Sequence, residues 1–339
     1  GSSQGGSNGS PLIGMVVLSG PGSKGPGRGT CKRRGGGFGG ARRRSRARKG
    51  DGGVEAAEEP AQAPKNGAKP PKPEKKYEEI RHLGSGAFGA AVLVRRRRDG
   101  HRFVAKKCCI ESLDQKQRDL CLEEIALLRR VRHECIAEVV DFVWASKDRL
   151  SYWLLLKHYA GGDVQKQIDD CRENDFEMPE GRVKNWTCQL CMALEHVHRL
   201  RIVHRDVKGS NMFITGLGNV VLGDFGVSKQ LGENCTKAMT SVGSPVFMAP
   251  ECWDGRGVGS ASDLWSAGVV LYELVSFRRP FEGGNVLSLV HKVTNEEPQA
   301  LPEDCDEEIR DLVARLLAKD PGARPSAAEA LRSPCLRQA

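Results

Sequence analysis

Apolar and polar residues alternate through residues 77–110, and this period of two predicts β-strands with one buried face. The pair Asp99-Gly100 interrupts the alternation and is a strong signal for a tight hairpin between two strands. The spacing of apolar residues becomes helical in 112–132, and 152–158 predicts a further strand. The ordered part of the chain is therefore expected to begin with a small, strand-rich region.

The pattern that follows is mostly helical. It predicts long helices in 183–200, 264–276 and 307–317. A strand-rich part followed by a larger helical part predicts a bilobal α+β fold with a cleft between the lobes. We place the small N-lobe and its hinge in 77–159 and the larger C-lobe in 160–338.

The first 76 residues differ from the rest in composition. Gly and Ser come first, an Arg- and Lys-rich stretch follows in 32–49, and a Pro- and Lys-rich linker fills 70–76. Residues 1–76 contain 16 Lys and Arg against 5 Asp and Glu, so the net positive charge of the chain lies here. Such a composition buries too little apolar surface to offset the entropy of ordering. We expect a disordered basic tail.

Two interpretations of this tail remain open. It is either a solvated extension or an arm for nuclear import or nucleic-acid binding built on the basic run 42–46. Phe38 is the only aromatic residue nearby, so stacking on bases is poorly supported. No apolar run approaches the roughly 18 residues that a membrane helix needs. We expect a cytoplasmic protein without a membrane partner, and the tail supports a nuclear location as the alternative.

The twelve cysteines show no compact disulfide framework. Cys188 and Cys191 form a lone CxxC pair in a helical run, and no second pair or nearby histidine completes the ligand set of a zinc site. We therefore expect reduced thiols.

Gly84, Gly86 and Gly89 form a GxGxxG pattern. Glycines let a backbone approach phosphates closely, with its N–H groups available to them. A dinucleotide-binding turn would lead directly into a helix, but the strand-like residues 91–95 follow instead. The pattern favours a glycine-rich flap over a nucleotide, with an ordinary hairpin as the alternative.

Lys107 is a candidate for contacting phosphates. In a strand it shares a face with Ala105, which we expect to point inward, while Lys106 points to the other side. An isolated lysine in a strand is usually solvated, but here a glycine flap precedes it and an acidic helix follows. Glu124 in that helix is a suitable partner for the ammonium group.

Two short blocks carry the strongest signal. The first reads His204-Arg205-Asp206-Val207-Lys208-Gly209-Ser210-Asn211, and the second reads Asp224-Phe225-Gly226. Together with the glycine flap they resemble, in the right order, the motifs of eukaryotic protein kinases of the serine/threonine type. The resemblance covers roughly residues 77–338.

The resemblance implies a role for each matching residue. Asp206 would accept or orient the proton of the substrate hydroxyl, and Lys208 would neutralise the moving γ-phosphoryl group. Asn211 and Asp224 would hold Mg²⁺ between the phosphates of ATP. Phosphoryl transfer needs positioning and charge compensation more than covalent chemistry, and these residue types supply both.

The resemblance also implies an ATP pocket. Lys107, paired with Glu124, would meet the α- and β-phosphates. The phosphates would lie under the flap residues Gly84, Ser85, Gly86, Ala87, Phe88 and Gly89. The adenine would pack on Leu83, Ala91 and Ala105, with Leu156 guarding the back of the pocket, and the backbone of Lys157 to Tyr159 would hydrogen-bond its edge.

Glu251 and Arg324 match a pair that anchors the large lobe in this family, so we expect them to be structural rather than catalytic. Ala91 replaces the usual valine over the adenine. Ser244 and Phe247 replace the usual threonine and tyrosine in the segment that docks the substrate. None of these changes removes a catalytic atom, so the resemblance predicts an active enzyme.

Regulation is expected at the segment after Gly226. Arg205 directly precedes Asp206, and in kinases with this arginine a phosphate on the activation segment often lies against it. Thr240 is our candidate for carrying that phosphate, which implies an upstream kinase as a partner. The alternative is that Thr240 is an ordinary loop hydroxyl.

Residues 189–215 and the segment 242–245 most resemble the NIMA-related kinases, which implies cell-cycle, centrosomal or ciliary roles. Val227 is β-branched, and such a residue at this place accompanies a preference for threonine acceptors across the family. The expected reaction is transfer of the γ-phosphate of ATP to Ser/Thr hydroxyls of protein substrates. The alternative is a catalytically silent nucleotide-binding scaffold that acts through its basic tail.

Overall fold

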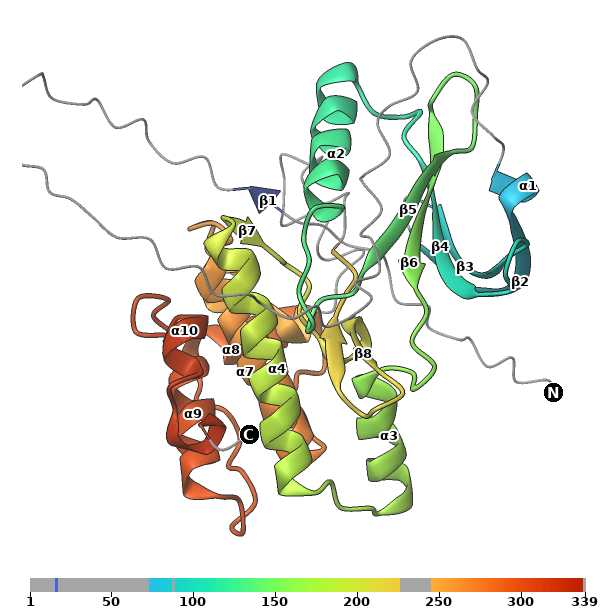
Figure 1. Ribbon diagram of the computed structural model, residues 1–339. Helices are drawn as coiled ribbons and strands as arrows, with labels where there is room; N and C mark the ends of the chain where they lie inside the picture. The colour runs from blue at the N-terminus through green and yellow to red at the C-terminus, as the bar shows by residue number, and fades with distance from the viewer. Residues whose placement is uncertain (1–15, 18–72, 87–88, 226–244, 338–339) are drawn as a thin grey trace, which may run out of the picture. The chain divides into compact units, whose positions relative to one another are not determined.

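The computed structural model describes residues 16–17, 73–86, 89–225 and 245–337 (Figure 1). Within the tail that was expected to be disordered, it describes two short pieces. These are β1 (Val16–Val17), which pairs with β7 (Ile202–Val203), and the helical turn α1 (Pro73–Lys76). The rest of the tail, with its basic run, lies outside the described residues, and its disorder stays a prediction.

A five-stranded antiparallel sheet forms the predicted strand-rich region, in the order β2-β3-β4-β6-β5. The strands are β2 (Tyr77–Gly86), β3 (Gly89–Arg96), β4 (Arg102–Cys109), β5 (Val139–Trp144) and β6 (Ser151–Lys157). The predicted hairpin joins β3 to β4, and Gly100 within it has a φ of 75°, a left-handed conformation that glycine adopts without strain. The predicted helix follows as α2 (Gln115–Leu128), somewhat shorter than the expected 112–132.

Both faces of this sheet are buried. One face, here the cleft face, includes Leu154 and joins α2 and the C-lobe in the large core. The opposite face, here the outer face, has a small core of its own, made of Tyr77, Val92, Val94, Phe103, Ala105, Val143, Trp153 and Leu155. Directly paired residues share a face, and Lys106 pairs with Leu154 whereas Lys107 pairs with Trp153. The two lysines therefore lie on opposite faces.

The C-lobe is mainly helical, as predicted. In the described part of this lobe the α-helices are α3 (Val164–Asn174), α4 (Glu180–Arg199), α6 (Pro250–Trp253), α7 (Ser260–Ser276), α8 (Val286–Asn295), α9 (Glu307–Leu316) and α10 (Ala327–Ala330). Strands β8 (Met212–Ile214) and β9 (Val220–Leu222) pair with each other. The three helices predicted from the sequence are thus confirmed as α4, α7 and α9, with ends that differ by a few residues.

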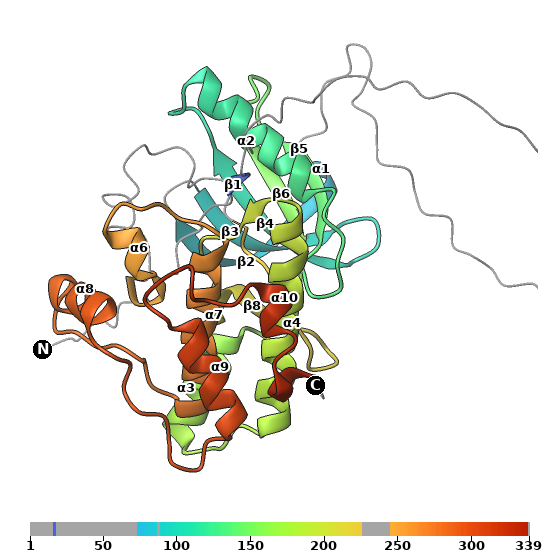
Figure 2. The same cartoon turned by 90° about the vertical axis from the view of Figure 1, so that its left-hand side faces the viewer.

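Helix α7 lies at the centre of the C-lobe core and contacts α4 and α9 (Figure 2). Its side chains Leu264, Trp265 and Val269 are almost wholly buried. Gly268 allows the close approach of α9, because a Cβ at this position would lie 2.7 Å from the Cβ of Leu316. This tightly packed helix is a rigid base for the loops above it.

The cysteines in the described part of the chain are free thiols, and Cys188 and Cys191 both lie on α4. Among the described residues, no helix combines the length and the apolar character that crossing a membrane takes.

Candidate active site

The predicted catalytic residues Asp206 and Lys208 and the predicted metal ligand Asn211 lie on the segment between β7 and β8, here called the catalytic loop. Lys208 and Asn211 each contact Asp206. The Nδ2 of Asn211 donates to the backbone carbonyl and to Oδ2 of Asp206, both at 2.7 Å. The Nζ of Lys208 lies 3.0 Å from the same Oδ2. All three side chains are buried. The loop therefore presents a carboxylate whose position is fixed by an amide and an ammonium group.

His204 links this loop to the segment that carries Asp224. Its Nδ1 accepts the backbone N–H of Asp206 at 3.3 Å, and its Nε2 donates to the carbonyl of Gly223 at 2.9 Å. These two bonds require the neutral tautomer, in agreement with the burial that lowers the pKa of His204. The ring also packs against Phe225, with ring centroids 4.6 Å apart. His204 thus holds both segments of the site together.

Asp263 in the first turn of α7 holds the backbone of the catalytic loop. Its Oδ2 accepts the N–H of His204 and its Oδ1 accepts the N–H of Arg205, both at 2.8 Å. His198 on α4 also contacts Oδ2 through Nε2, at 2.8 Å. Arg205 has a φ of 66°, a strained value for a residue with a side chain, and these bonds hold it there.

The motifs did not assign this anchoring role to Asp263 or His198. The available signal was a carboxylate isolated within an apolar helix, because a buried charge requires several hydrogen-bond donors. The structure supplies those donors from the catalytic loop and α4.

The lysine on the cleft face is Lys106. The prediction that Lys107 points into the site is wrong. Lys106 is 8% exposed, and its Nζ forms an ion pair with Oδ1 of Asp224. Burial lowers the pKa of Lys106 to about 8, although the nearby Asp206 carboxylate opposes this effect. Lys106, and not Lys107, therefore lies beside Asp224.

Lys107 lies on the outer face, at the protein surface. Its Nζ is 2.6 Å from Oε1 of Glu79 and 4.7 Å from the ring centroid of Trp153. Ala105, predicted to contact the adenine, is wholly buried in the core of the same face, so that prediction is also wrong. Both faces of the sheet are buried, so a buried alanine does not identify the face that borders the cleft.

Glu124 lies on the buried side of α2 and is 3% exposed. Its predicted ion pair with Lys107 is not formed, because Lys107 is bonded to Glu79 on the other face. Glu124 is on the side of the sheet that α2 covers, which is the side of Lys106. The predicted pairing of Glu124 with Lys107 is therefore wrong, because the two residues lie on opposite sides of the sheet.

The glycine flap is the hairpin between β2 and β3. Gly84, Ser85 and Gly86 end β2, and Gly89 begins β3. Gly89 has a φ of 148°, and a Cβ there would lie 1.7 Å from the backbone oxygen of Lys107, so only glycine fits. Ala87 and Phe88 lie outside the described residues. The strand after the flap is confirmed, and the contact with phosphates stays a prediction.

Ala91, predicted over the adenine, and Leu156, predicted at the back of the pocket, both lie on the cleft face. Ala91 pairs with Lys106 across β3 and β4, and Leu156 pairs with Val104 across β4 and β6. Val104 therefore occupies the cleft-face position that was predicted for Ala105. Leu83 lies near the end of β2 and is 41% exposed.

The hinge, residues 157–159 at the end of β6, is held by contacts with Glu138 and Phe213. The backbone N–H of Lys157 donates to the carbonyl of Glu138 at 3.0 Å, and the N–H of Glu138 donates to the hydroxyl of Tyr159 at 3.4 Å. The ring of Tyr159 stacks on Phe213, with centroids 6.2 Å apart and planes inclined by 5°. These contacts fix the backbone that is predicted to bind the edge of the adenine.

Asn211 and Asp224 have the chemistry of a Mg²⁺ site. Asn211 uses its Nδ2 for the bonds to Asp206, which leaves its amide oxygen as a ligand atom, and Asp224 contributes a carboxylate. Mg²⁺ prefers such oxygen ligands together with phosphates and water. The ion pair with Lys106 shows that the Asp224 carboxylate attracts a cation. Within the described ranges, no group of three or more His, Cys, Asp or Glu side chains is placed to hold a metal ion.

The predicted structural pair Glu251 and Arg324 is confirmed. Nη1 and Nη2 of Arg324 each lie 2.7 Å from one carboxylate oxygen of Glu251, and the hydroxyl of Ser262 donates to the same carboxylate at 2.8 Å. All three residues are buried. The pair ties α6 to the loop before α10.

Several predicted regulatory and docking residues fall in 226–244, outside the described residues. Thr240, Val227 and Ser244 are among them. Arg205 is described at the start of the catalytic loop and is partly buried. Its contact with a phosphorylated Thr240 stays a prediction.

Comparison with known proteins agrees with this geometry. The family model "Protein kinase domain" matches residues 77–336. Serine/threonine-protein kinase Nek1 of Mus musculus is 33% identical over 251 residues, which cover 74% of this chain and 20% of that protein. Serine/threonine-protein kinase Nek3 of Oryza sativa subsp. japonica is 36% identical over 262 residues, or 77% of this chain and 44% of that protein.

A third relative is the probable serine/threonine-protein kinase nek2 of Dictyostelium discoideum. It is 31% identical over 258 residues, which cover 75% of this chain and 61% of that protein. The matched part of the chain thus spans between a fifth and about three fifths of the length of these relatives.

Proposed function

This chain belongs to the protein kinase family, and on that premise we propose that it transfers the γ-phosphate of ATP to serine and threonine hydroxyls of protein substrates. The observation that carries the proposal is the set of contacts among Asp206, Lys208 and Asn211 on the loop after β7. The similarity to kinases named Nek supports the serine/threonine class.

Asp206 is the proposed proton acceptor. The substrate oxygen forms a bond to the γ-phosphorus, the bond from this phosphorus to the β–γ bridging oxygen breaks, and the hydroxyl proton passes to the carboxylate of Asp206. Asn211 and Lys208 both engage Oδ2 of that carboxylate, so Oδ1 is the oxygen directed to the hydroxyl. The fixed carboxylate orients the attacking oxygen and needs no rearrangement during the reaction.

Two lysines supply positive charge. Lys208 is held beside Asp206 and compensates the charge of the transferring group. Lys106, on the cleft face of β4, contacts the phosphates that remain with the nucleotide. Its ion pair with Asp224 keeps the ammonium group in the cleft when no nucleotide is bound.

Asn211 and Asp224 are the residues that would hold Mg²⁺. When bound, the metal neutralises phosphate charge and lowers the cost of bringing an electron-rich oxygen to the phosphorus. Asp224 stands at a φ of 58°, directly after the Gly223 carbonyl that His204 holds, so the described hydrogen bonds fix the start of its segment.

The test of this function is transfer of labelled phosphate from ATP with Mg²⁺ to a generic basic protein. The full chain is compared with Asp206→Asn, which keeps the shape of the side chain. We expect the full chain to transfer phosphate. The rate of the variant should be lower by a factor of at least about 100, because a general base contributes at least that much. Nucleotide binding and circular dichroism serve as the control for folding. Equal rates would contradict the role of Asp206, and nucleotide binding without transfer by either protein would favour a scaffold.

Regulation by phosphorylation of Thr240 is a further part of the proposal. The position of Arg205 at the start of the catalytic loop supports it, because this loop is what a phosphate at Arg205 would stabilise. We expect Thr240→Ala to abolish activation by an upstream kinase. Full activation of that variant would contradict the proposal.

A cell-cycle, centrosomal or ciliary role in the cytoplasm is proposed from the resemblance to the NIMA-related kinases. The basic composition of residues 1–76 supports nuclear import as the alternative location. Imaging the tagged full chain and a chain without residues 1–76 separates the two, since only a tail-driven import signal would be lost with the deletion.

A further inference from the structure

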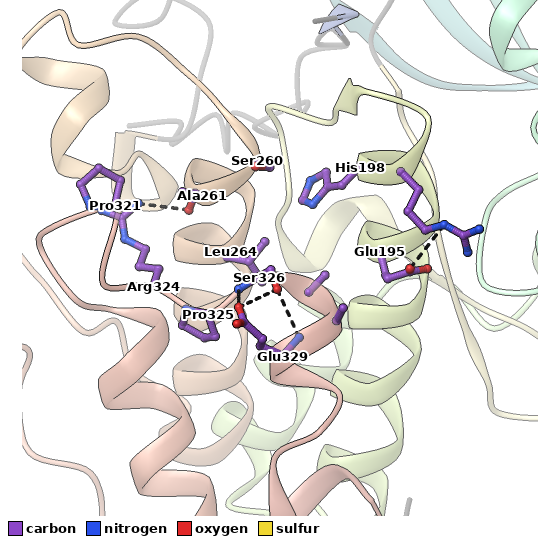
Figure 3. Close-up of a pocket in the computed structure, with 13 residues that line it drawn as sticks. Glu195, His198, Ser260, Ala261, Leu264, Pro321, Arg324, Pro325, Ser326 and Glu329 are labelled. Atoms are coloured by element: carbon purple, nitrogen blue, oxygen red, sulfur yellow. Dashed lines mark hydrogen bonds and ion pairs between the residues drawn. The ribbon is translucent and has the colours of Figure 1, made fainter. Parts of the chain in front are cut away.

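A cavity of about 440 Å³ in the C-lobe has no assigned role (Figure 3). It is walled by the end of α4, the start of α7, the loop 321–325 and α10, and none of its lining residues belongs to the catalytic loop. A space of this size accommodates a small organic ligand. Much of the wall is apolar and is formed by Ala261, Leu264, Pro321, Pro325, Ala327 and Ala328.

Arg324 lines the cavity but has no hydrogen-bond donor left for a ligand. Its Nε donates to the carbonyl of Ala318, and Nη1 donates to Glu251 and to the carbonyl of Ala261. Nη2 donates to Glu251 and to the carbonyl of Lys319. These bonds use all five N–H groups of the guanidinium, and its charge is neutralised by the Glu251 carboxylate. Arg324, the buried cation of the cavity, therefore cannot bind an anionic ligand.

His198 and Ser326 have also committed their donors. Nε2 of His198 lies 2.8 Å from the Asp263 carboxylate, which can only accept, so the hydrogen on Nε2 is already used. The hydroxyl of Ser326 donates to Oε2 of Glu329 at 2.7 Å. Neither of these two hydrogens is available to a ligand.

The remaining charged groups at the rim are Glu195, Glu329 and Arg199. Figure 3 shows Glu195 and Glu329 on opposite sides of the cavity. Arg199 holds Glu195 only loosely, with Nε 3.7 Å from Oε1 and with 75% of its side chain exposed. An exposed pair of this length contributes little and is readily replaced. Oε2 of Glu329 already accepts the N–H and the hydroxyl of Ser326, so the cavity offers the Glu195 carboxylate and Oε1 of Glu329 above an apolar wall.

We propose that this cavity binds a small organic cation with an apolar body, such as an aryl amidine. The body lies against Ala261, Pro321, Pro325 and Ala328, and the positive charge lies at the carboxylate of Glu195, with Glu329 across the cavity as a second negative charge. The ligand cation takes the place of Arg199 at Glu195. This site is separate from the cleft that holds the nucleotide.

Calorimetric titration of the full chain with three probes of equal shape tests the charge preference. The probes are benzamidine, which is a cation, benzamide, which is neutral, and benzoate, which is an anion. We expect benzamidine to bind best and benzoate least, with or without saturating ATP and Mg²⁺. Equal or tighter binding of benzoate, or competition between benzamidine and ATP, would overturn the proposal.

Two substitutions on α4 give effects of opposite sign. Glu195→Gln should weaken benzamidine binding about tenfold, the loss expected for one charge-assisted hydrogen bond. Arg199→Ala should strengthen binding, because it frees the Glu195 carboxylate. Glu303→Gln removes the same charge from an exposed residue that does not line the cavity and is the matched control. Unchanged affinity in both α4 variants would overturn the site.

A third substitution and a peptide complete the test. Ala328→Trp fills the cavity from α10 and should abolish binding, with thermal unfolding as the control for folding. A capped arginine peptide distinguishes a free small molecule from the side chain of a protein partner. Tighter binding of that peptide than of benzamidine would overturn the assignment to a small molecule.

Discussion

The cleft face and the outer face of the N-lobe sheet put neighbouring lysines to different uses. On the cleft face, Lys106 is buried, has a lowered pKa and forms an ion pair with Asp224. On the outer face, Lys107 is partly exposed and rests on Trp153 and Glu79. A buried ammonium group is costly unless a charged partner or ligand compensates it, whereas a surface ammonium remains hydrated. The lysine whose charge is costly to bury is therefore the one that lies beside Asp224 of the candidate site.

The largest difference between the faces is expected in catalysis. Lys106→Met should lower phosphate transfer about 100-fold or more, because it removes a charge aimed at the phosphates. Lys107→Met should change the rate by less than about threefold, because its partners lie on the outer face. Steady-state rates of both variants, at equal amounts of folded protein, measure this. Equal losses of transfer rate in the two variants would contradict the proposed difference between the two lysines.

A substitution in the core of the outer face should instead lower the stability of the protein and leave its transfer rate nearly unchanged. Trp153 is 4% exposed in the core of the outer face, and Trp153→Ala should lower the free energy of unfolding by about 3–5 kcal/mol. The transfer rate per folded molecule should stay within about threefold, a change of less than 1 kcal/mol. Urea unfolding together with activity below the transition tests both statements. A large loss of rate in fully folded protein would show that the outer face also serves catalysis.

The pH dependence of acylation tests whether the ammonium group of Lys106 is desolvated on the cleft face. Burial lowers the pKa of Lys106 from 10.5 to about 8, so its amine is protonated and unreactive below pH 8 and free above it. We expect its labelling by a small acylating reagent, followed by mass spectrometry without nucleotide, to rise with a midpoint near pH 8. A midpoint above pH 10 would show that the ammonium group is not desolvated.

The smallest effect is expected for the surface pair. Glu79→Gln removes the partner of Lys107, with 46% and 30% of the two side chains exposed. The free energy of unfolding should fall by no more than about 1 kcal/mol, and less in high salt. Urea unfolding at low and high salt measures the change. A fall of several kcal/mol in the free energy of unfolding would show that the Lys107–Glu79 pair contributes as much as a buried ion pair.

Much of the fold was predictable because its signals are local. The alternation in 77–110 and the helical spacing of α4, α7 and α9 are each contained in one stretch of sequence. The Asp206 to Asn211 contacts also follow from one motif, because the residues share a loop.

The choice between Lys106 and Lys107 was not predictable by the same reasoning. Alternation assigns adjacent residues to opposite faces, but it does not say which of two buried faces borders the cleft. The anchoring by Asp263 was also out of reach, since it joins residues 59 positions apart. Such contacts depend on how the helices pack, and no local pattern records them.

The placement of Lys106 in the nucleotide cleft is the central claim, and labelling with an acyl phosphate of ATP tests it most directly. In this reagent the lysine amine nearest the phosphates attacks the acyl carbon, and ATP leaves. Peptide mapping of the full chain, with excess ATP as the competitor, identifies the acylated residue. We predict ATP-protected acylation of Lys106 and none of Lys107. Protected acylation of Lys107 in place of Lys106 would contradict the account.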